Sequence, residues 1–551
     1  MVRRILSIFT REIRGLHEAA YVLAGFSLLS QVLALVRDRT FAHLFGAGPV
    51  LDAYFAAFRI PDIVFAFLTL FVSSFALVPL LSARDEKEQG KLLGNVLFAF
   101  GTVAVAVAVV LWFTIPRLVP FLFPGFSKDA LENTVTLSRL MLAQPVLLGL
   151  SSIASSVIQV LRRFVIFALA PILYNVGIII GALFFYPVFG ISGLAGGVVV
   201  GAVLHFAAQA IPLFGHTRHM VRPSFASLGS SIIDVAIPSM PRALALSAQQ
   251  VLLLAFAGIA SLTVAGTISA LSFSFNLQSV PLTVIGLSYA AALFPALAAL
   301  MAKGDTDGFI REVWASIRHI IFWTFPAITM IVVLRAHIVR VILGTGAFSW
   351  NDTRLTAALL ACFALSLISQ SVILIFSRAY YAAHETLTPI MVNVSAALVA
   401  ALAAYYGVIW VGSTDLPRFF IEVLFRVGDV PGTPAIIIPL AYSLVMIVAS
   451  FVFAFLFARK FAYESRTGNT LLVSFASSVI AGASAYGTLQ LLGPLLPTAT
   501  FVGLLTQGAS AGIVGLVAWI ATLYLLKSAE LEEIRAMLHK QFPKPDLLTR
   551  Q

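Results

Sequence analysis

Long apolar stretches separated by short polar segments fill the chain from residue 20 to residue 526. A membrane-spanning helix needs about 20 mainly apolar residues, and fourteen stretches meet that requirement. Several of them are longer than one crossing needs, so tilted or protruding helices are expected. We therefore predict an all-α, multi-pass membrane protein with about fourteen spans. The stretches cover residues 20–36, 53–81, 92–115, 132–160, 164–186, 191–213, 228–259, 263–301, 312–343, 353–382, 387–412, 435–458, 469–491 and 501–526.

The composition excludes the main soluble classes. Hydrophobic residues make up 60% of the chain and charged residues only 11%, whereas a soluble protein carries about 25% charged residues. The formal net charge of +11 indicates no nucleic-acid partner, because the basic residues lie mostly between apolar stretches, where membrane topology needs them. The single cysteine, Cys362, allows no intrachain disulfide and no cysteine metal cluster.

The two ends of the chain are predicted to lie in the cytoplasm. Residues 1–19 alternate arginines with large apolar side chains, a pattern typical of a helix that lies on a membrane surface. Basic residues concentrate in every second loop, so the positive-inside rule places the N-terminus inside. After fourteen spans the charged tail 528–551 is inside as well. The alternating residues are Arg3, Arg4, Ile5, Phe9, Arg11, Ile13, Arg14 and Leu16.

Two short motifs recur at nearly the same offset. The sequence PILYNV at 171–176 returns as PIMVNV at 389–394, 218 positions later, and LVP at 77–79 returns as LFP at 293–295, 216 positions later. Both matches join span n to span n+6. An even number of spans per copy makes the copies parallel, as in transporters whose two halves face each other. The sequence therefore predicts two parallel six-helix repeats around a central cavity, plus two extra C-terminal helices.

This repeat predicts the domain organisation. An N-lobe covers 20–213, a C-lobe covers 225–460, and the two extra helices cover 468–527. Asn175 and Asn393, each four residues after a proline in its repeat, are interpreted as hydrogen bonders in helix packing rather than as ligands.

Charged residues inside the spans are the candidate site residues, because such residues are costly in lipid and usually face a cavity or a partner. One interpretation is a structural ion-pair network near the outer interface. The other places Arg37 and Arg59 in the cavity, where they bind an anionic substrate, while Asp38 or Asp52 holds their geometry. Arg242 lies where prolines can break its span, so a cavity role is left open. The ionisable residues in or at the ends of spans are Arg37, Asp38, Arg39, Asp52, Arg59, Asp62, Arg139, Asp234 and Arg242.

Motifs for covalent chemistry are missing from the sequence. The nine histidines form no HExxH motif or metal-ligand spacing, and no phosphate-binding glycine loop occurs. We therefore expect no catalytic residue, metal or cofactor, and no intrinsic ATP hydrolysis. No acidic residue lies mid-span in spans seven to fourteen, so an ion site in that half is not expected. Membrane potential and an ion gradient both remain open as energy sources.

The first 61 residues carry a family resemblance. Arg37-Asp38, then FGAG at 45–48 and DAYFAAFRIP at 52–61, resemble the start of the MurJ/MviN lipid II flippases, members of the multidrug/oligosaccharidyl-lipid/polysaccharide exporter superfamily. The segment 171–175 is similar to the fifth span of that family.

The resemblance implies a function. The protein would flip lipid II, an undecaprenyl-diphosphate-linked glycopeptide, from the inner to the outer leaflet of the bacterial cytoplasmic membrane by alternating access. Spans thirteen and fourteen would form a groove for the lipid tail, and membrane lipids would be the other partners. The oligomeric state is left open. The substrate-binding residues would be Arg37, Asp38, Asp52, Arg59, Arg242, Asn276 and Gln31.

The sequence also departs from the family. Gln31, Phe65 and Asn276 stand at positions where family members typically carry basic residues. This loss leaves two alternatives to lipid II flipping. One is export of another lipid-linked oligosaccharide or amphipathic substrate by the same fold, and the other is a non-transporting membrane scaffold.

Overall fold

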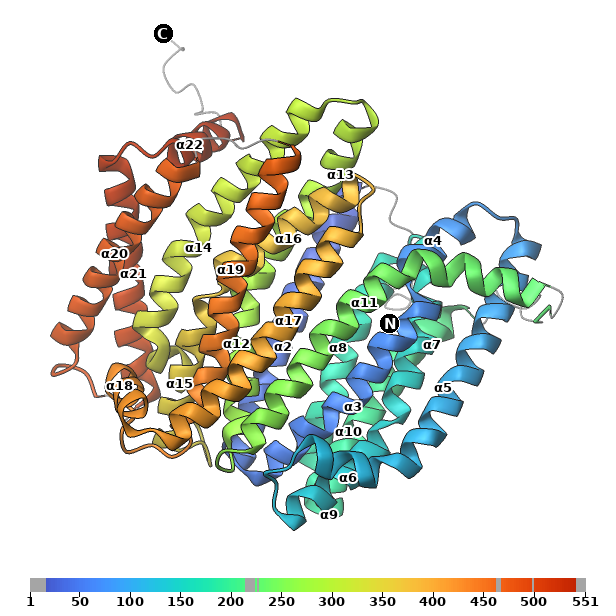
Figure 1. The fold of residues 1–551 in the computed structure, drawn as a ribbon, viewed down its shortest axis with the longest axis horizontal. Helices are drawn as coiled ribbons and strands as arrows, with labels where there is room; N and C mark the ends of the chain where they lie inside the picture. The colour runs from blue at the N-terminus through green and yellow to red at the C-terminus, as the bar shows by residue number, and fades with distance from the viewer. Residues whose placement is uncertain (1–15, 214–222, 225–226, 462–466, 498–499, 542–551) are drawn as a thin grey trace, which may run out of the picture.

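The computed structural model describes residues 16–213, 223–224, 227–461, 467–497 and 500–541, and these ranges form a bundle of long helices (Figure 1). Most of the amphipathic segment predicted at 1–19 lies outside the described residues, as do residues 542–551 of the tail. Helices α3 to α10 lie on one side of the molecule and α12 to α19 on the other, with α20 and α21 at the outer edge (Figure 1).

The first half consists of the helices up to residue 213. In this half, α3 and α4 form one broken span, as do α6 and α7. Its helices are α2 (Leu16–Phe45), α3 (Pro49–Val72), α4 (Ser74–Ser82), α5 (Glu86–Leu122), α6 (Lys128–Met141), α7 (Ala143–Val160), α8 (Phe164–Ile180), the π-helical segment η1 (Gly181–Phe185), α9 (Tyr186–Phe189), α10 (Ile191–Ala210) and η2 (Ile211–Leu213).

The second half begins with α11, which packs against α3 of the first half and α17 of the second. Helices α20 and α21 follow this half and pack against each other and against α14. The helices are α11 (Leu228–Ser261), α12 (Thr267–Pro281), η4 (Leu282–Leu287), α13 (Ser288–Ala302), α14 (Thr306–Leu343), α15 (Trp350–Ala364), α16 (Leu367–Ala382), α17 (Leu387–Ser413), α18 (Asp415–Phe425), η5 (Thr433–Ile436), α19 (Ile437–Lys460), α20 (Thr467–Leu492), α21 (Phe501–Leu525) and α22 (Ala529–Gln541).

The predicted spans correspond to helices of the structure. Among the described residues, 12 helical segments are long and apolar enough to cross a membrane, and the pair α15–α16, bent by 41°, adds one more. Helix α2 covers the remaining predicted stretch. The all-α, multi-pass prediction is therefore confirmed.

One break in the helices recurs at the predicted period of six spans. The span that contains α6 and α7 breaks at Leu142, and its counterpart six spans later breaks between Ala364 and Leu367. In the recurring proline–asparagine motif, the Asn175 side chain donates to the Pro171 carbonyl at 3.1 Å, and Asn393 donates to Pro389 at 2.8 Å. The same local hydrogen bond at both copies supports the parallel repeat.

Small residues hold α8 and α10 unusually close. A Cβ atom at Gly177 would lie 2.3 Å from Gly201 Cα, and one at Gly181 would lie 2.4 Å from Gly197 Cα. These glycines are four residues apart on each helix, so they form one stripe per helix. The two backbones can touch only because these four positions carry no Cβ atom. This contact fixes the position of α8 against α10.

Replacing Gly197 by valine should separate α8 from α10 and lower the midpoint of thermal unfolding in detergent by several degrees. Overpacking of this kind costs about 1–3 kcal/mol or more. Gly196→Val is the matched control, because a Cβ atom there meets only a Phe185 ring atom at 3.6 Å. Equal unfolding midpoints for the two variants would contradict the role of the stripe.

The two halves are joined at the end where α2 stops and α3 starts. Arg39 of α2 donates to the carbonyls of Val341 at 2.6 Å and Ile342 at 2.9 Å, at the end of α14. The amide of Ala347 donates to the His43 carbonyl at 2.9 Å. These bonds bring α2 against the loop between α14 and α15, so the halves are in direct contact at this end.

Candidate functional site

Arg37 is the centre of a hydrogen-bonded network that links the two halves. Its guanidinium donates to Asp38 Oδ1 through Nε at 3.0 Å and through Nη2 at 2.7 Å, and its Nη1 donates to Asn175 Oδ1 at 3.1 Å. The second Asp38 oxygen accepts from Asn276 Nδ2 at 2.9 Å. Since Asn276 lies on α12 and the other three on α2 and α8, the network crosses the boundary between the halves.

The local structure of α8 explains how Asn175 reaches Arg37. The amide nitrogen of its side chain is held by the Pro171 carbonyl one turn earlier, which leaves Oδ1 free to accept from Arg37. Close packing of α8 on α10 places this turn against α2. Asn175 was predicted to form hydrogen bonds in helix packing, and the bond that joins α8 to α2 is the one it accepts from Arg37.

Arg59 and Asp62 lie beside this network, one helical turn apart on α3. Asp62 is the carboxylate whose charge acts on Arg59, and Asp62 Oδ1 accepts from Gln144 Nε2 of α7 at 3.5 Å. Tyr174, next to Asn175, lies within electrostatic range of both Arg37 and Asp62. Charged, hydroxyl and amide groups from α2, α3, α7, α8 and α12 therefore gather in one region, which we call the arginine cluster: Arg37, Asp38, Tyr54, Arg59, Asp62, Gln144, Tyr174, Asn175 and Asn276.

Three buried polar atoms of the arginine cluster have no hydrogen-bond partner in the described part of the chain: Arg59 Nε, Tyr174 Oη and Gln144 Oε1. Two of them are hydrogen-bond donors. Buried polar groups are normally satisfied, so a set of them at one place calls for an explanation. A bound anion would accept from both donors.

Asp52 has a different role from the one predicted. Its Oδ2 accepts from the Gly266 amide at 2.5 Å, and its Oδ1 accepts from the Ser269 amide at 2.8 Å and the Ser269 hydroxyl at 2.6 Å. These groups belong to the first turn of α12, whose amides have no partner within the helix. Asp52 thus caps α12 and joins the halves, and of the two candidate carboxylates only Asp38 holds an arginine.

The remaining predicted residues lie outside this network or outside the described side chains. Gln31 is half-buried on α2, six residues before Arg37 and therefore about 120° away around the helix. Phe65 is half-buried on α3. Arg242 belongs to α11, but its side chain is not among the described ones. Arg139 donates to the Trp112 carbonyl at 2.9 Å and lies over that ring.

Sequence reasoning missed Tyr174 and Gln144 as members of the cluster. Neither is charged, and their spans contain other residues of the same types. The recurring motif at 171–176 contained Tyr174 and was the one signal that could have indicated it. What brings Gln144 to Asp62 is the break between α6 and α7, which the sequence did not predict.

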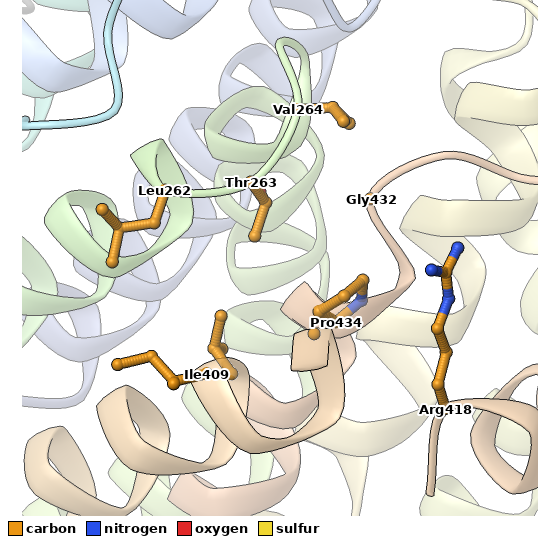
Figure 2. A pocket seen from close by; sticks show the side chains of 9 residues that line it. Leu262, Thr263, Val264, Ile409, Arg418, Gly432 and Pro434 are labelled. Carbon is orange, nitrogen blue, oxygen red and sulfur yellow. The ribbon is translucent and has the colours of Figure 1, made fainter. Parts of the chain in front are cut away.

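A pocket of about 320 Å³ lies away from the arginine cluster, between the α11–α12 loop and α17 (Figure 2). Its lining is mainly apolar and includes Thr263, Ile409 and Pro434. The one charged side chain on it, Arg418, is paired with Glu422 at 2.8 Å. Burial opposes ionisation of Glu422, but hydrogen bonds from Arg418 and Thr433 outweigh it and lower the pKa of Glu422 below its usual value.

A second pocket, of about 340 Å³, lies between α2 of the first half and helices of the second half. Apolar residues of α2, α12, α14 and α15 line it, among them Leu35, Leu277 and Met330. Leu35 and Leu277 are close in sequence to Arg37 and Asn276, but residues one or two apart on a helix point in different directions. The pocket is therefore a separate apolar space between α2 and the second half. No group of three or more potential metal ligands occurs among the described residues.

Comparison with known proteins gives consistent sequence matches. Residues 41–506 match the family described as lipid II flippase MurJ. A lipid II flippase MurJ of Burkholderia cenocepacia is 26% identical over 418 residues, which cover 73% of this chain and 80% of that protein. A probable lipid II flippase MurJ of Vibrio cholerae is 27% identical over 435 residues, which cover 75% of this chain and 83% of that protein.

Solved structures show the same fold. The structure of a lipid II flippase MurJ in an inward closed conformation is similar with a TM-score of 0.71 at 21% identity, covering 92% of this chain and 98% of that one. An inward-facing multidrug resistance transporter of the MATE family follows with a TM-score of 0.64 at 16% identity, covering 82% and 98%. The family match includes most of the chain and confirms the resemblance seen in the first 61 residues. The chain belongs to the lipid II flippase MurJ family, whose members are transporters and not enzymes.

Proposed function

We propose that this protein flips lipid II across the bacterial cytoplasmic membrane and that the arginine cluster binds the diphosphate of the lipid. Membership of the flippase family supports the reaction. The observation that carries the site is the pair of unpartnered buried donors, Arg59 Nε and Tyr174 Oη, beside the Arg37 guanidinium. A diphosphate offers several acceptor oxygens, and arginine suits phosphate because its donors are fixed in a fork.

The position of the cluster supports alternating access. Asn276 holds Asp38 from the second half while Asn175 holds Arg37 from the first. A substrate that displaces either bond changes the contact between the halves. Rocking of two parallel repeats about a site between them is the motion expected for this architecture.

The apolar pocket between α2, α12, α14 and α15 supports a lipid-linked substrate. We propose that prenyl units of the lipid occupy this space, which Leu35, Leu277 and Met330 line. Met330 also packs against the side chains of α20 and α21. We propose that the lipid tail runs from this pocket toward α20 and α21, the two helices outside the repeat. We also propose that the N-lobe, the C-lobe and this pair of helices are the three structural units predicted from the sequence.

The direction of transport follows from the orientation. We propose that both termini lie in the cytoplasm, since the basic loops are on the side of the termini. The end at which α2 meets the α14–α15 loop then faces outward, and the contacts there close the outer side. This orientation presents the cluster to lipid II from the inner leaflet.

The composition of the cluster argues against a cation exporter of the same fold. The multidrug transporters that share the fold are the nearest alternative. In this chain the carboxylate of Asp38 is already neutralised by Arg37, and Asp62 faces Arg59. The free hydrogen-bonding capacity consists mainly of donors, which favours an anionic substrate.

Binding of three lipids to the purified protein in nanodiscs tests the proposed function. Lipid II and undecaprenyl diphosphate should bind at least tenfold more tightly than phosphatidylglycerol, because only they combine a diphosphate with a prenyl tail. Native mass spectrometry reports the occupancies. Equal affinity for all three lipids would exclude a diphosphate-specific site.

A further inference from the structure

Asp62 is the least compensated carboxylate among the described acidic residues within the spans. Asp38 accepts two bonds from Arg37 and one from Asn276, and Asp52 accepts three bonds from α12. Asp62 has one hydrogen bond, from Gln144, at the 3.5 Å limit. Its charge is balanced only by Arg59, one turn away.

The described groups that surround Asp62 come from its own helix and from the helices packed against it. Arg59 and Tyr54 share its helix, and Tyr174 faces it from α8. From α7 it meets the uncharged Gln144. Of the described charged groups on neighbouring helices, Arg37 is bonded to Asp38 on α2, Asp234 of α11 is bonded to Arg84, Arg139 of α6 is over Trp112, and His205 of α10 is bonded to Ser151. The charged side chains of α5 are exposed, and the side chain of Arg242 on α11 is outside the described ones.

Asp62 therefore competes with any anion for Arg59. When a diphosphate takes the guanidinium, the Asp62 carboxylate is left in a low-dielectric region next to two further negative charges. Such a group becomes neutral by binding a proton. No other charged group among its described neighbours is free to replace Arg59.

We propose that Asp62 is a proton-binding site whose occupancy is linked to that of the diphosphate site. This inference rests on the proposed function, because it needs the anion to bind Arg59. In the empty protein Asp62 is ionised and its negative charge balances that of Arg59. In the loaded protein a proton from solution sits on an Asp62 carboxylate oxygen and Arg59 faces the diphosphate. Proton uptake on binding means that affinity rises as the pH falls, up to tenfold per pH unit while a whole proton is taken up.

The linkage is measured by titrating undecaprenyl diphosphate into the protein in nanodiscs at several pH values and counting the protons taken up in weakly buffered solution. The wild type should take up close to one proton more per bound lipid than Asp62→Asn. Taking the difference between the two proteins removes the protons that the lipid itself binds. Asp62→Asn should also bind about tenfold more tightly at pH 7.5, because the competitor for Arg59 is gone. Asp62→Glu keeps a carboxylate and should keep the extra proton.

The outcomes separate this inference from the proposed function. Equal proton counts and equal affinities in wild type and Asp62→Asn overturn the linkage while leaving the diphosphate site intact. A wild type that binds undecaprenyl diphosphate no better than phosphatidylglycerol at any pH overturns the proposed function itself. If Asp62→Asn elutes as aggregate, the protons taken up by undecaprenyl diphosphate in nanodiscs without protein are subtracted instead. An extra proton in neither wild type nor Asp62→Glu then overturns the linkage.

Discussion

Replacing Arg37 by alanine should abolish lipid II flipping in proteoliposomes and weaken binding of undecaprenyl diphosphate about ten- to hundredfold. The estimate follows because a hydrogen bond to a charged group contributes about 1.5–3 kcal/mol and each 1.4 kcal/mol is about tenfold in affinity. Arg37 also joins the halves through Asp38, Asn175 and Asn276. Its loss removes the anion contact and the link between the halves together.

A control for folding is needed because Arg37→Ala leaves Asp38 buried without its cation, which destabilises proteins. The double variant Arg37→Gln/Asp38→Asn removes both charges and should fold like the wild type yet remain inactive. Arg139→Ala is the matched arginine control, since Arg139 rests on Trp112 outside the cluster, and it should flip lipid II normally. Normal flipping by a well-folded Arg37→Ala protein would contradict the site.

Much of the architecture could be predicted from the sequence because its physical cause is local. Apolar length is enough to indicate a span in lipid, and two motif matches at nearly the same offset, 171–176 with 389–394 and 77–79 with 293–295, indicated the six-span repeat. The breaks could not be predicted in the same way. No proline lies in α15 or α16 to mark the bend of 41° between them. The break at Leu142 does have a local cause, since Pro145 has no amide hydrogen to donate to the Met141 carbonyl, but that proline was not interpreted as a break.

The candidate site was predicted in part for a similar reason. Arg37 and Arg59 stand out because charges in spans are costly, and Asn276 was noticed because the family typically has a cation there. The structure shows a physical consequence of that difference: Asn276 donates to Asp38, a contact that a neutral amide makes without adding charge. The partners of Asp52 could not be inferred, since its bonds depend on α12, more than 200 positions away.

The arginine cluster has only two cations, and its two aspartates balance them in the empty protein. An anion site is still consistent with this composition if one aspartate is neutralised when the anion binds. Arg37 and Arg59 each face an aspartate, so the cluster has little net charge when empty. Proton binding at Asp62 would leave one uncompensated positive charge only when the diphosphate is present. In this way the protein would avoid an isolated cation inside the membrane, which is costly, through the empty part of its cycle.

Replacing Gly266 by alanine should open the joined end of the two halves. Gly266 has φ +94°, and a Cβ atom there would lie 2.3 Å from the Ala47 carbonyl oxygen. The residue also donates its amide to Asp52 at 2.5 Å. The left-handed backbone costs about 1–3 kcal/mol for a residue with a side chain, and the clash must move α12 away from the start of α3.

A single cysteine at Ala42, which is fully buried beside this joint, reports the opening in a Cys362→Ser background. Gly266→Ala should raise its labelling rate by a membrane-impermeant maleimide at least tenfold. Gly304→Ala is the matched control, because Gly304 also has a positive φ of +73° but open space where its Cβ would lie. The Gly304→Ala variant introduces backbone strain without a steric clash. If the labelling rate rises equally in both variants, the contact between α12 and α3 does not close the outer end of the protein. Faster labelling in Gly266→Ala alone would place the outer closure of the transport cycle at the contact of Asp52 with α12.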